Sequence, residues 1–322
     1  MLGQINRLDC AACSSFLTLH SKFSEPVQTK RQIQQLLAQA GASPKKRLGQ
    51  HFLIDLNLIK LLMECADIGE SDIVLEVGCG TGSLTESLAA KAGRVVAVEV
   101  DRRLAQITAE QLEKHRNVEV INCDVLESKN SISQAVVKRL DAARRQCSGR
   151  MLLVANLPYN AASAVIANLA IGPTVADGMF VTVQKEVAER MIAGPGSRRY
   201  GSLSIMLGAT GQVKKIRILK PSVFWPEPQV ASAMVSFVRS PDKCRRIKDM
   251  GVFAAVVSLF MGHRRKTLRS CARLSASRPM NVANWVDVLE KCSIDPGARA
   301  EQLSPEDYVA AANACRGIIR ND

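Results

Sequence analysis

The chain of 322 residues has no apolar run that could cross a membrane and no clear secretory signal. Its longest mainly apolar run, Val252 to Met261, is about half of the roughly 20 residues that a transmembrane helix needs. The first 23 residues lack an apolar core between a basic start and a cleavage site. We therefore expect a cytoplasmic protein without a membrane partner.

The cysteines lack the spacing of a zinc site or a disulfide framework. There are 10 cysteines spread along the chain, and only Cys10 and Cys13 lie close together. A structural zinc site needs further ligands, so this pair is interpreted as part of a loose extension over residues 1–26, with a metal site as the alternative. No metal is expected, and a chain of this size favours reduced thiols.

Acidic residues are scarce compared with basic ones. The chain has 30 Asp and Glu against 43 Lys and Arg, a formal net charge of +13. An excess of this size favours a polyanionic partner, with nucleic acid first and an anionic membrane second. The hydrophobic content of 47% and charged content of 23% are otherwise typical of a globular protein.

Two basic stretches contain no acidic residue, namely residues 190–226 and residues 264–273. A charged run is usually only a solvated helix face, but the missing acids favour contacts with phosphate. Arg265, Arg269 and Arg273 recur at helical spacing, which predicts one basic helix face. The basic residues of the two stretches are Arg190, Arg198, Arg199, Lys214, Lys215, Arg217, Lys220, Arg264, Arg265, Lys266, Arg269 and Arg273.

Apolar runs alternate with helical periodicity between residues 73 and 238. Helix-like segments separate the first five runs, which predicts an α/β fold with a mainly parallel, doubly wound sheet. A helix from Gln32 that ends at Gly41, and a second capped by Asp55, precede the sheet. The predicted strands are 73–77, 95–99, 118–122, 151–155, 179–184, 213–219 and 232–238.

The pattern changes after Pro241. Residues 249–274, 281–291 and 305–316 have helical patterns, and no further strand is predicted. We therefore expect a sheet domain over residues 27–240, including an N-terminal lid helix, and a small all-helical domain over residues 241–322.

Three consecutive predicted strands end in residues suited to a nucleoside cofactor. The first runs into Gly78, Gly80 and Gly82, which allow a tight turn and a close approach of the backbone to a ligand. Their spacing differs from the dinucleotide fingerprint. Glu99 ends the second strand, where an acid can accept hydrogen bonds from ribose hydroxyls, and Asp124 follows the third. The three together favour S-adenosylmethionine over a nicotinamide cofactor.

The fourth strand ends in Asn156, Leu157, Pro158 and Tyr159. The Asn amide offers a donor and an acceptor, Pro disfavours a helical conformation of the residue before it, and Tyr provides a flat face for a nucleobase. Alone, these residues would be interpreted as a strand-ending turn with a surface tyrosine. Beside the other three strand ends, they predict a site that modifies a base.

These stretches resemble the ribosomal RNA adenine N6-dimethyltransferases, most closely the KsgA (RsmA) type that acts on bacterial small-subunit rRNA. The resemblance runs over roughly residues 30 to 315. It implies a Rossmann-like class I methyltransferase fold with a mainly parallel seven-stranded sheet and S-adenosylmethionine as the cofactor. The family-like segments are residues 49–53, 76–82, 99–101, 124, 156–159, 184–188, 200–204, 224–230, 264–269 and 303–308.

The resemblance also implies roles for individual residues. The cofactor would be held by His51, Leu53, Gly78, Gly80, Glu99, Asp124 and Asn156. Many relatives carry Asn at the position of His51, so its contact could come partly from the backbone. The Asn156 side chain and the Leu157 carbonyl would accept the two N6 protons of the target adenine, and Tyr159 and Phe224 would stack on the flipped base. RNA would be bound by Arg198, Arg199, Arg264, Arg265, Lys266 and Arg269.

The implied activity is dimethylation of two adjacent adenosines near the 3′ end of small-subunit rRNA, on the immature subunit, by a monomer. A resistance-type methyltransferase of large-subunit rRNA is the nearest alternative; Leu157, typically Ile in that group, and residues 264–269 and 303–308 argue against it. DNA adenine methyltransferases usually carry a second Pro at the position of Leu157. A non-catalytic assembly or transcription factor is disfavoured by the intact glycine loop, Glu99 and Asn156.

Overall fold

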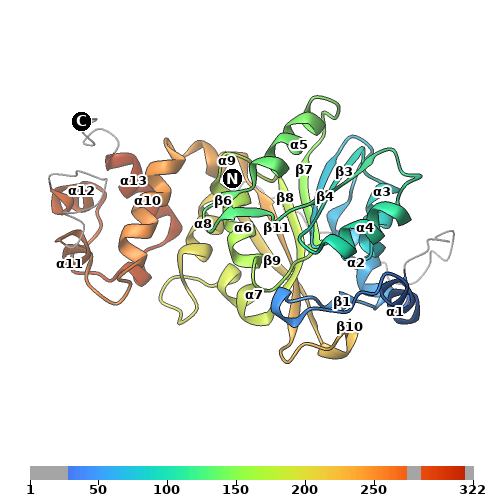
Figure 1. Cartoon of the computed structure of the whole chain (residues 1–322). Coiled ribbons are helices and arrows are strands. Elements are labelled where there is room, and N and C mark those ends of the chain that lie inside the picture. Colours follow the sequence, from blue (N-terminus) through green and yellow to red (C-terminus); the bar gives the residue numbers. More distant parts are fainter. Residues whose placement is uncertain (1–27, 274–283, 316–322) are drawn as a thin grey trace, which may run out of the picture.

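A seven-stranded sheet organises the computed structural model, which describes residues 28–273 and 284–315 (Figure 1). Its strand order is β4-β3-β2-β7-β8-β11-β9, and β11 runs antiparallel to both of its neighbours while the other pairs are parallel. All seven predicted strands are confirmed. They are β2 (Ile73–Val77), β3 (Arg94–Glu99), β4 (Val118–Asn122), β7 (Met151–Asn156), β8 (Gly178–Gln184), β9 (Gly211–Leu219) and β11 (Ser232–Arg239).

Helices cover both faces of the sheet because the central strands are apolar on both sides. Side chains of α5 (Gln134–Arg144) and α6 (Ala162–Ile171) pack on one face, with α7 (Lys185–Ile192). Those of α2 (Leu56–Ala66) and α3 (Ser83–Ala89) pack on the other. The layered arrangement brings the carboxyl ends of the parallel strands to one edge of the sheet.

The N-terminal segment lies beside that edge. Helix α1 (Lys30–Gln39) begins with a capping box between Thr29 and Gln32, and it packs on α4 (Arg102–Gln111). The predicted cap at Asp55 is confirmed, since its carboxylate accepts from the first N–H groups of α2. A 3₁₀ turn, η2, covers Lys46–Leu48.

Two short strand pairs were not predicted. Strand β1 (Phe52–Leu53) pairs with β10 (Phe224–Trp225), just after η3 (Pro221–Val223), and β5 (Leu126–Ser128) pairs with β6 (Ser131–Ile132). Runs of two or three residues are too short to show the alternation by which a strand is recognised. The β1–β10 pair ties the N-terminal segment to a loop about 170 residues further along the chain.

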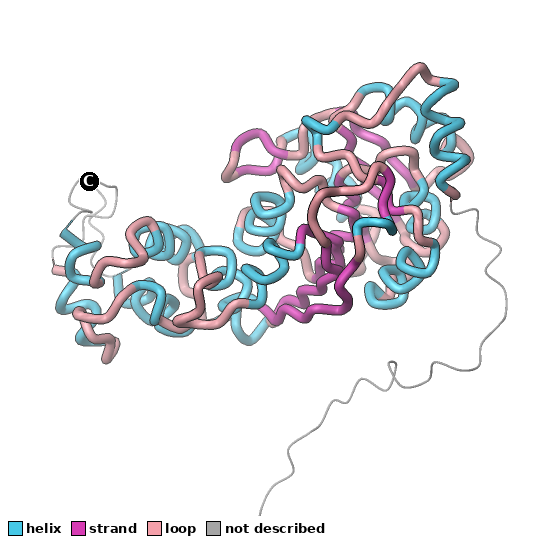
Figure 2. The backbone as a smooth tube through the Cα atoms, turned by 90° about the horizontal axis from the view of Figure 1, so that it is seen from below, coloured by secondary structure: helices cyan, strands magenta, loops and turns pink. Residues whose placement is uncertain are grey.

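The C-terminal region is helical, as predicted, and extends away from the sheet (Figure 2). The predicted helix over 249–274 is wrong in its extent, because turns at residues 262–267 separate two helices. Thr267, bridged to Arg299, directly precedes the second of them, and its hydroxyl accepts the Ser270 N–H. The elements are α9 (Pro241–Arg245), α10 (Met250–Met261), α11 (Leu268–Arg273), α12 (Trp285–Lys291), η4 (Ala300–Gln302) and α13 (Pro305–Cys315).

The helical region has its own hydrophobic cluster, built around Phe253, Phe260, Trp285 and Tyr308. Helix α8 (Ser202–Thr210), which precedes β9, contributes to this cluster although it lies within the predicted sheet domain. The predicted boundary at residue 240 therefore stays a prediction. The predictions for residues 1–26, including Cys10 and Cys13, lie outside the described residues, as do ends of the three predicted C-terminal helices, at 274, 281–283 and 316.

Within the described ranges, no helix is both long and apolar enough to span a bilayer. The 8 cysteines found there are free thiols.

Candidate functional site

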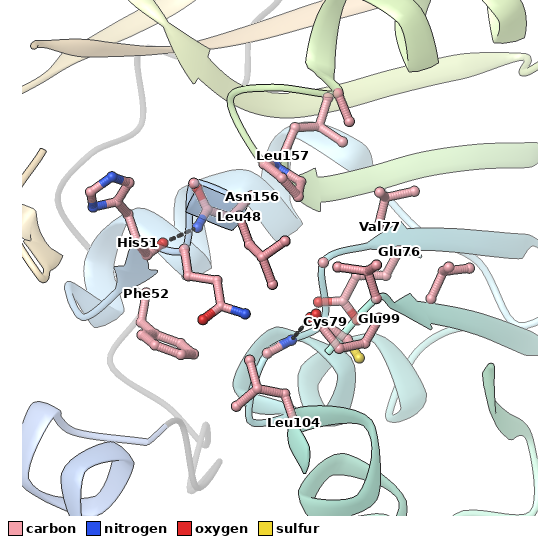
Figure 3. Close-up of a pocket in the computed structure, with 18 of the residues that line it drawn as sticks. Leu48, His51, Phe52, Glu76, Val77, Cys79, Glu99, Leu104, Asn156 and Leu157 are labelled. Carbon is pink, nitrogen blue, oxygen red and sulfur yellow. Dashed lines mark hydrogen bonds between the residues drawn. The ribbon is translucent and has the colours of Figure 1, made fainter. Parts of the chain in front are cut away.

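A cavity of about 310 Å³ opens at the carboxyl ends of β2, β3 and β7, beneath the N-terminal segment. Residues far apart in the sequence meet here, as Figure 3 shows for His51, Glu99 and Asn156. Every residue predicted to hold the cofactor lines this cavity, as does every residue of the target loop (residues 156–159). Phe224, which was predicted to stack on the target base, does not. The residues brought together are His51, Leu53, Gly78, Gly80, Glu99, Asp124, Asn156, Leu157, Pro158 and Tyr159.

The glycine loop forms one wall, and two of its glycines have close neighbours. Gly78 has φ +80°, and a Cβ atom there would lie 2.9 Å from Cγ of Pro158. Gly80 has φ +63°, and a Cβ atom there would lie 2.9 Å from Cε1 of Phe52. Both positions combine a left-handed backbone with a space that has no room for a methyl group, which is the reason glycine occupies them.

Glu99 braces this loop from the end of β3. Its buried carboxylate accepts the Gly80 N–H at 3.0 Å with Oε2 and the Asp101 N–H at 2.9 Å with Oε1. Burial raises the pKa of Glu99. Each carboxylate oxygen has a second lone pair for a ligand hydroxyl, so the structure is compatible with the predicted role.

Glu76 is a second buried carboxylate of the cavity wall, and it was not predicted (Figure 3). Its Oε2 atom has no hydrogen-bond partner within the part of the chain that the structure describes. Burial, together with the nearby charge of Glu99, raises its pKa to about 8. An acidic residue inside the otherwise apolar strand 73–77 was the available sequence signal.

Asp124 follows β4, the strand next to β3, and also lines the cavity. Its side chain is exposed, and Oδ1 accepts the Leu126 N–H at 2.9 Å. This bond holds the carboxylate beside the cavity and leaves its other oxygen open.

Asn156 is held from both ends of its amide. Its Nδ2 donates to the His51 carbonyl at 2.7 Å (Figure 3), and its Oδ1 accepts from the Thr182 hydroxyl. A carbonyl oxygen can only accept, so the NH₂ group must face His51 and the amide oxygen must face Thr182. His51 contacts Asn156 through its backbone carbonyl, while its predicted contact with the cofactor stays a prediction.

The backbone carbonyls of Leu157 and Pro158 differ in their hydrogen bonding. The Pro158 carbonyl accepts the N–H groups of Ala161 and Ala162, at 3.0 and 3.1 Å, at the start of α6. The Leu157 carbonyl accepts no hydrogen bond from any described residue. With no donor among the described residues, the Leu157 oxygen is available for an outside donor.

Tyr159 forms the wall beside Asn156. Its hydroxyl lies 2.7 Å from that of buried Ser232, and its ring centroid is 5.2 Å from that of His51. His51 Nδ1 donates to the Pro226 carbonyl at 2.6 Å. The Tyr159 ring is therefore fixed at two points, a condition for a stacking platform.

Phe224 differs from its predicted position. It is 1% exposed, pairs with Leu53 in the β1–β10 ribbon and belongs to the core cluster beneath the sheet. Its burial follows from the ribbon, which turns the ring away from solvent. The prediction that it stacks on a base stays untested, and the structure does not place it in the cavity.

A second cavity is lined by Arg190, Arg198, Arg199 and Arg264 at the start of α8. The two basic stretches contain no acidic residue, but the fold brings acidic residues from elsewhere in the chain next to them. Glu186 forms ion pairs with Arg190 and with Arg199, the latter at 2.8 Å. Glu301 lies 3.6 Å from Arg264. The expectation that these arginines lack acidic partners is therefore wrong. Arg198 has no ion pair with a described residue.

Arg265, Lys266 and Arg269 are exposed and make no ion pair with any residue in the described ranges. The predicted basic helix face is wrong for Arg265, which lies in the turn before α11 rather than on a helix with Arg269 and Arg273. Exposed, unpaired cations nevertheless remain available for phosphate.

Gln28 contacts the glycine loop and was not predicted to do so. Its side-chain Nε2 donates to the Thr81 carbonyl at 2.8 Å, and its Oε1 accepts from the Thr81 hydroxyl at 2.6 Å. Its backbone N–H donates to the Ser83 hydroxyl. These buried contacts anchor the start of the described chain on the glycine loop. A lone Gln in a polar segment carries no sequence signal for such a contact.

The sheet order, the glycine loop and the acidic strand ends define a Rossmann-like class I methyltransferase fold. A dimethyladenosine transferase from Plasmodium falciparum shares this fold, with a TM-score of 0.64 and 24% identity over 81% of this chain and 96% of that chain. The 23S rRNA methyltransferase ErmE has a TM-score of 0.56 and 23% identity over 82% of this chain and 98% of that one.

The family described as ribosomal RNA adenine dimethylase matches residues 41–316. A ribosomal RNA small subunit methyltransferase A from Pelotomaculum thermopropionicum is 37% identical over 282 residues, 88% of this chain and 95% of the relative. The protein of the same name from a Geobacillus strain is 32% identical over 92% of this chain and 100% of the relative. The chain belongs to the ribosomal RNA adenine dimethylase family.

Proposed function

We propose that this chain transfers methyl groups from S-adenosylmethionine to the N6 amines of two adjacent adenosines near the 3′ end of small-subunit rRNA. The observation that carries the proposal is the pair of acceptors on the target loop. The Asn156 amide oxygen and the unused Leu157 carbonyl both belong to the wall of the cavity. The names of the relatives support small-subunit rRNA as the substrate.

The residues present fit the cofactor. S-adenosylmethionine supplies a methyl group that is already activated by its sulfonium centre. The unpaired, buried Oε2 of Glu76 is suited to accept from a cationic ammonium. Glu99 would accept from the ribose hydroxyls and Asp124 from the adenine amine, while Gly78 leaves the backbone bare beside Pro158.

The protein's own contribution to the reaction is positioning. The N6 lone pair of adenine is delocalised into the ring, so it is a weak nucleophile. Acceptors at Asn156 and Leu157 would hold the two N6 protons and favour a pyramidal nitrogen. Correct orientation can account for about 7–11 kcal/mol of barrier lowering, so no general base is required.

The target base must leave its stack to reach this loop, at a cost of a few kcal/mol. Tyr159, fixed by Ser232 and His51, would offset part of this cost by stacking on the base. A site with room for one methyl group on N6 would accept the singly methylated base for a second transfer.

The RNA would lie along the basic residues of both regions. Arg198, Arg199 and Arg264 share one cavity wall, and Arg265, Lys266 and Arg269 follow in the chain. The proposed division is a methyltransferase domain over residues 27–240 and a helical RNA-binding domain over residues 241–322, and each would contribute basic residues to the RNA contact. The proposed partner is the immature small subunit, bound by a cytoplasmic monomer.

The test is transfer of labelled methyl groups to immature small subunits and to large subunits, followed by mapping of the modified bases. Dimethylated adjacent adenosines in small-subunit RNA are expected. Label found only in large-subunit RNA would instead support the resistance-type activity, and label in neither RNA would support a non-catalytic factor.

Asn156→Ala should lower kcat by about 100-fold or more, because it removes an acceptor that acts on the reacting amine. Asn117→Ala is the matched control, since the Asn117 amide donates to the carbonyls of Ala89 and Ala92 and does not line the cavity. Full activity of the Asn156 variant would contradict the proposed role.

A further inference from the structure

Thr182 is a buried polar residue in an apolar part of β8. It is 1% exposed and lies between Val181 and Val183, which are 0% exposed. A buried hydroxyl without a partner is unfavourable by about 1–3 kcal/mol, so such a group is normally hydrogen-bonded. The partner of the Thr182 hydroxyl identifies what this residue does.

The sheet register places Thr182 beside Asn156. The two residues are direct partners in the parallel β7–β8 pair, so their side chains emerge on the same face. Thr182 donates its hydroxyl proton to Oδ1 of Asn156. Its backbone carbonyl also accepts the Leu157 N–H at 3.2 Å. One residue thus contacts both members of the acceptor pair.

The geometry of the Asn156 amide depends on this bond. The terminal torsion of an Asn side chain is broad and two-fold, so a single anchor does not define the plane of the amide. The His51 carbonyl holds Nδ2 at one end, at 2.7 Å, and Thr182 holds Oδ1 at the other. The Thr182 bond uses one lone pair of Oδ1 and leaves the second for an outside donor.

We propose that Thr182 is a positioning residue, which orients the Asn156 amide oxygen and the Leu157 loop toward the N6 amine of the target adenine. The proposal rests on the proposed function for the identity of the amine. Thr182 does not line the cavity, so it acts through Asn156 and Leu157 rather than on substrate or cofactor.

The direct test compares Thr182→Val, which has the same shape but no hydroxyl, with Thr182→Ser, which retains the donor. The kcat of the Val variant should fall by about 10- to 100-fold, because small misplacements of a reacting group cost up to about 100-fold. The KM for S-adenosylmethionine should change less than kcat, since Asn156 is the one predicted cofactor residue that Thr182 contacts and those on β2 and β3 are untouched. The Ser variant should regain most of the rate.

Thr210→Val is the matched control for loss of a buried hydroxyl. Thr210 is 0% exposed and donates to the Met206 carbonyl at 2.7 Å within α8, outside the cavity. Its kcat should equal that of the parent protein, whatever its loss of stability. Three results would each overturn the proposal: a Thr182→Val rate within about twofold of the parent, a Thr182→Ser rate as low as that of Thr182→Val, or an equal loss in the control.

A second measurement does not require RNA. Crystal structures of the parent and of Thr182→Val should show the Asn156 amide rotated in the variant, and an unchanged amide would overturn the proposal. A parent protein that methylates no RNA would refute the proposed function alone, because the amide orientation would still support or overturn the positioning role.

Discussion

Replacing Gly78 by Ala tests how the glycine loop and the target loop fit together. The Cβ atom added at Gly78 would lie 2.9 Å from Cγ and 3.1 Å from Cδ of Pro158. These atoms belong to a ring closed onto the backbone, so they cannot rotate away as the end of a flexible side chain could. Either the glycine loop or the loop of residues 156–159 must therefore move.

The expected loss of stability has two parts. The φ of +80° at Gly78 disfavours an L-residue by about 1–2 kcal/mol, and overpacking in a close-packed site costs typically about 1–3 kcal/mol. The free energy of unfolding should thus fall by about 2–5 kcal/mol. Gly196 provides the control, because its φ is +78° and no atom lies within 4 Å of its ideal Cβ position.

Urea unfolding of Gly78→Ala and Gly196→Ala measures the two parts separately. Gly196→Ala should lose only about 1–2 kcal/mol, from the backbone conformation. Titration calorimetry should show weaker binding of S-adenosylmethionine to Gly78→Ala alone, because the added methyl group lies against the cavity wall. Equal stability losses in the two variants, with unchanged cofactor binding, would refute the argument from close packing.

Two further predictions concern charged residues, namely the buried Glu76 and the exposed Arg265 and Arg269. Burial raises the pKa of Glu76 from 4.5 to about 8. The stability gained by binding this proton in the folded state is fully present below pH 4.5 and is lost as the pH rises through about 8. The free energy of unfolding, measured in urea at successive pH values, should decline over this range in the parent and less in Glu76→Gln; parallel curves would contradict the assignment. The double variant Arg265→Ala, Arg269→Ala should bind RNA more weakly, and the slope of log K against log salt should decrease by about 1.4–1.8, as expected for two phosphate contacts. An unchanged slope, or the same decrease for exposed Lys60 and Lys114 on the sheet region, would show that these arginines do not contact phosphate.

The sheet and the cofactor edge were predictable from the sequence because local patterns specify them. Each strand is a run of five or more mostly apolar residues, long enough to be recognised without its partners. Parallel strands connected by helices end at one edge, so Gly78, Glu99 and Asp124 had to lie near one another. The identity of the target, by contrast, came from resemblance to a family and from the relatives found.

Contacts between distant parts of the chain were not predictable. The two-residue strands at Leu53 and Phe224 exist only because they pair with each other, and this pairing buries a ring that was expected to face a base. The ion pairs of Glu186 with Arg190 and Arg199 also required the fold, because the acid lies outside the basic stretch.

The sequence by itself determined which residues follow four of the strands, and their types suit a nucleoside, since residue type and the order of strands along the chain are local properties. Only the tertiary structure decided how the acceptors are held. Thr182 and Asn156 are 26 residues apart and become neighbours through the register of β7 and β8. A threonine in a strand is ordinary, and its role depends on which side chain the sheet places beside it.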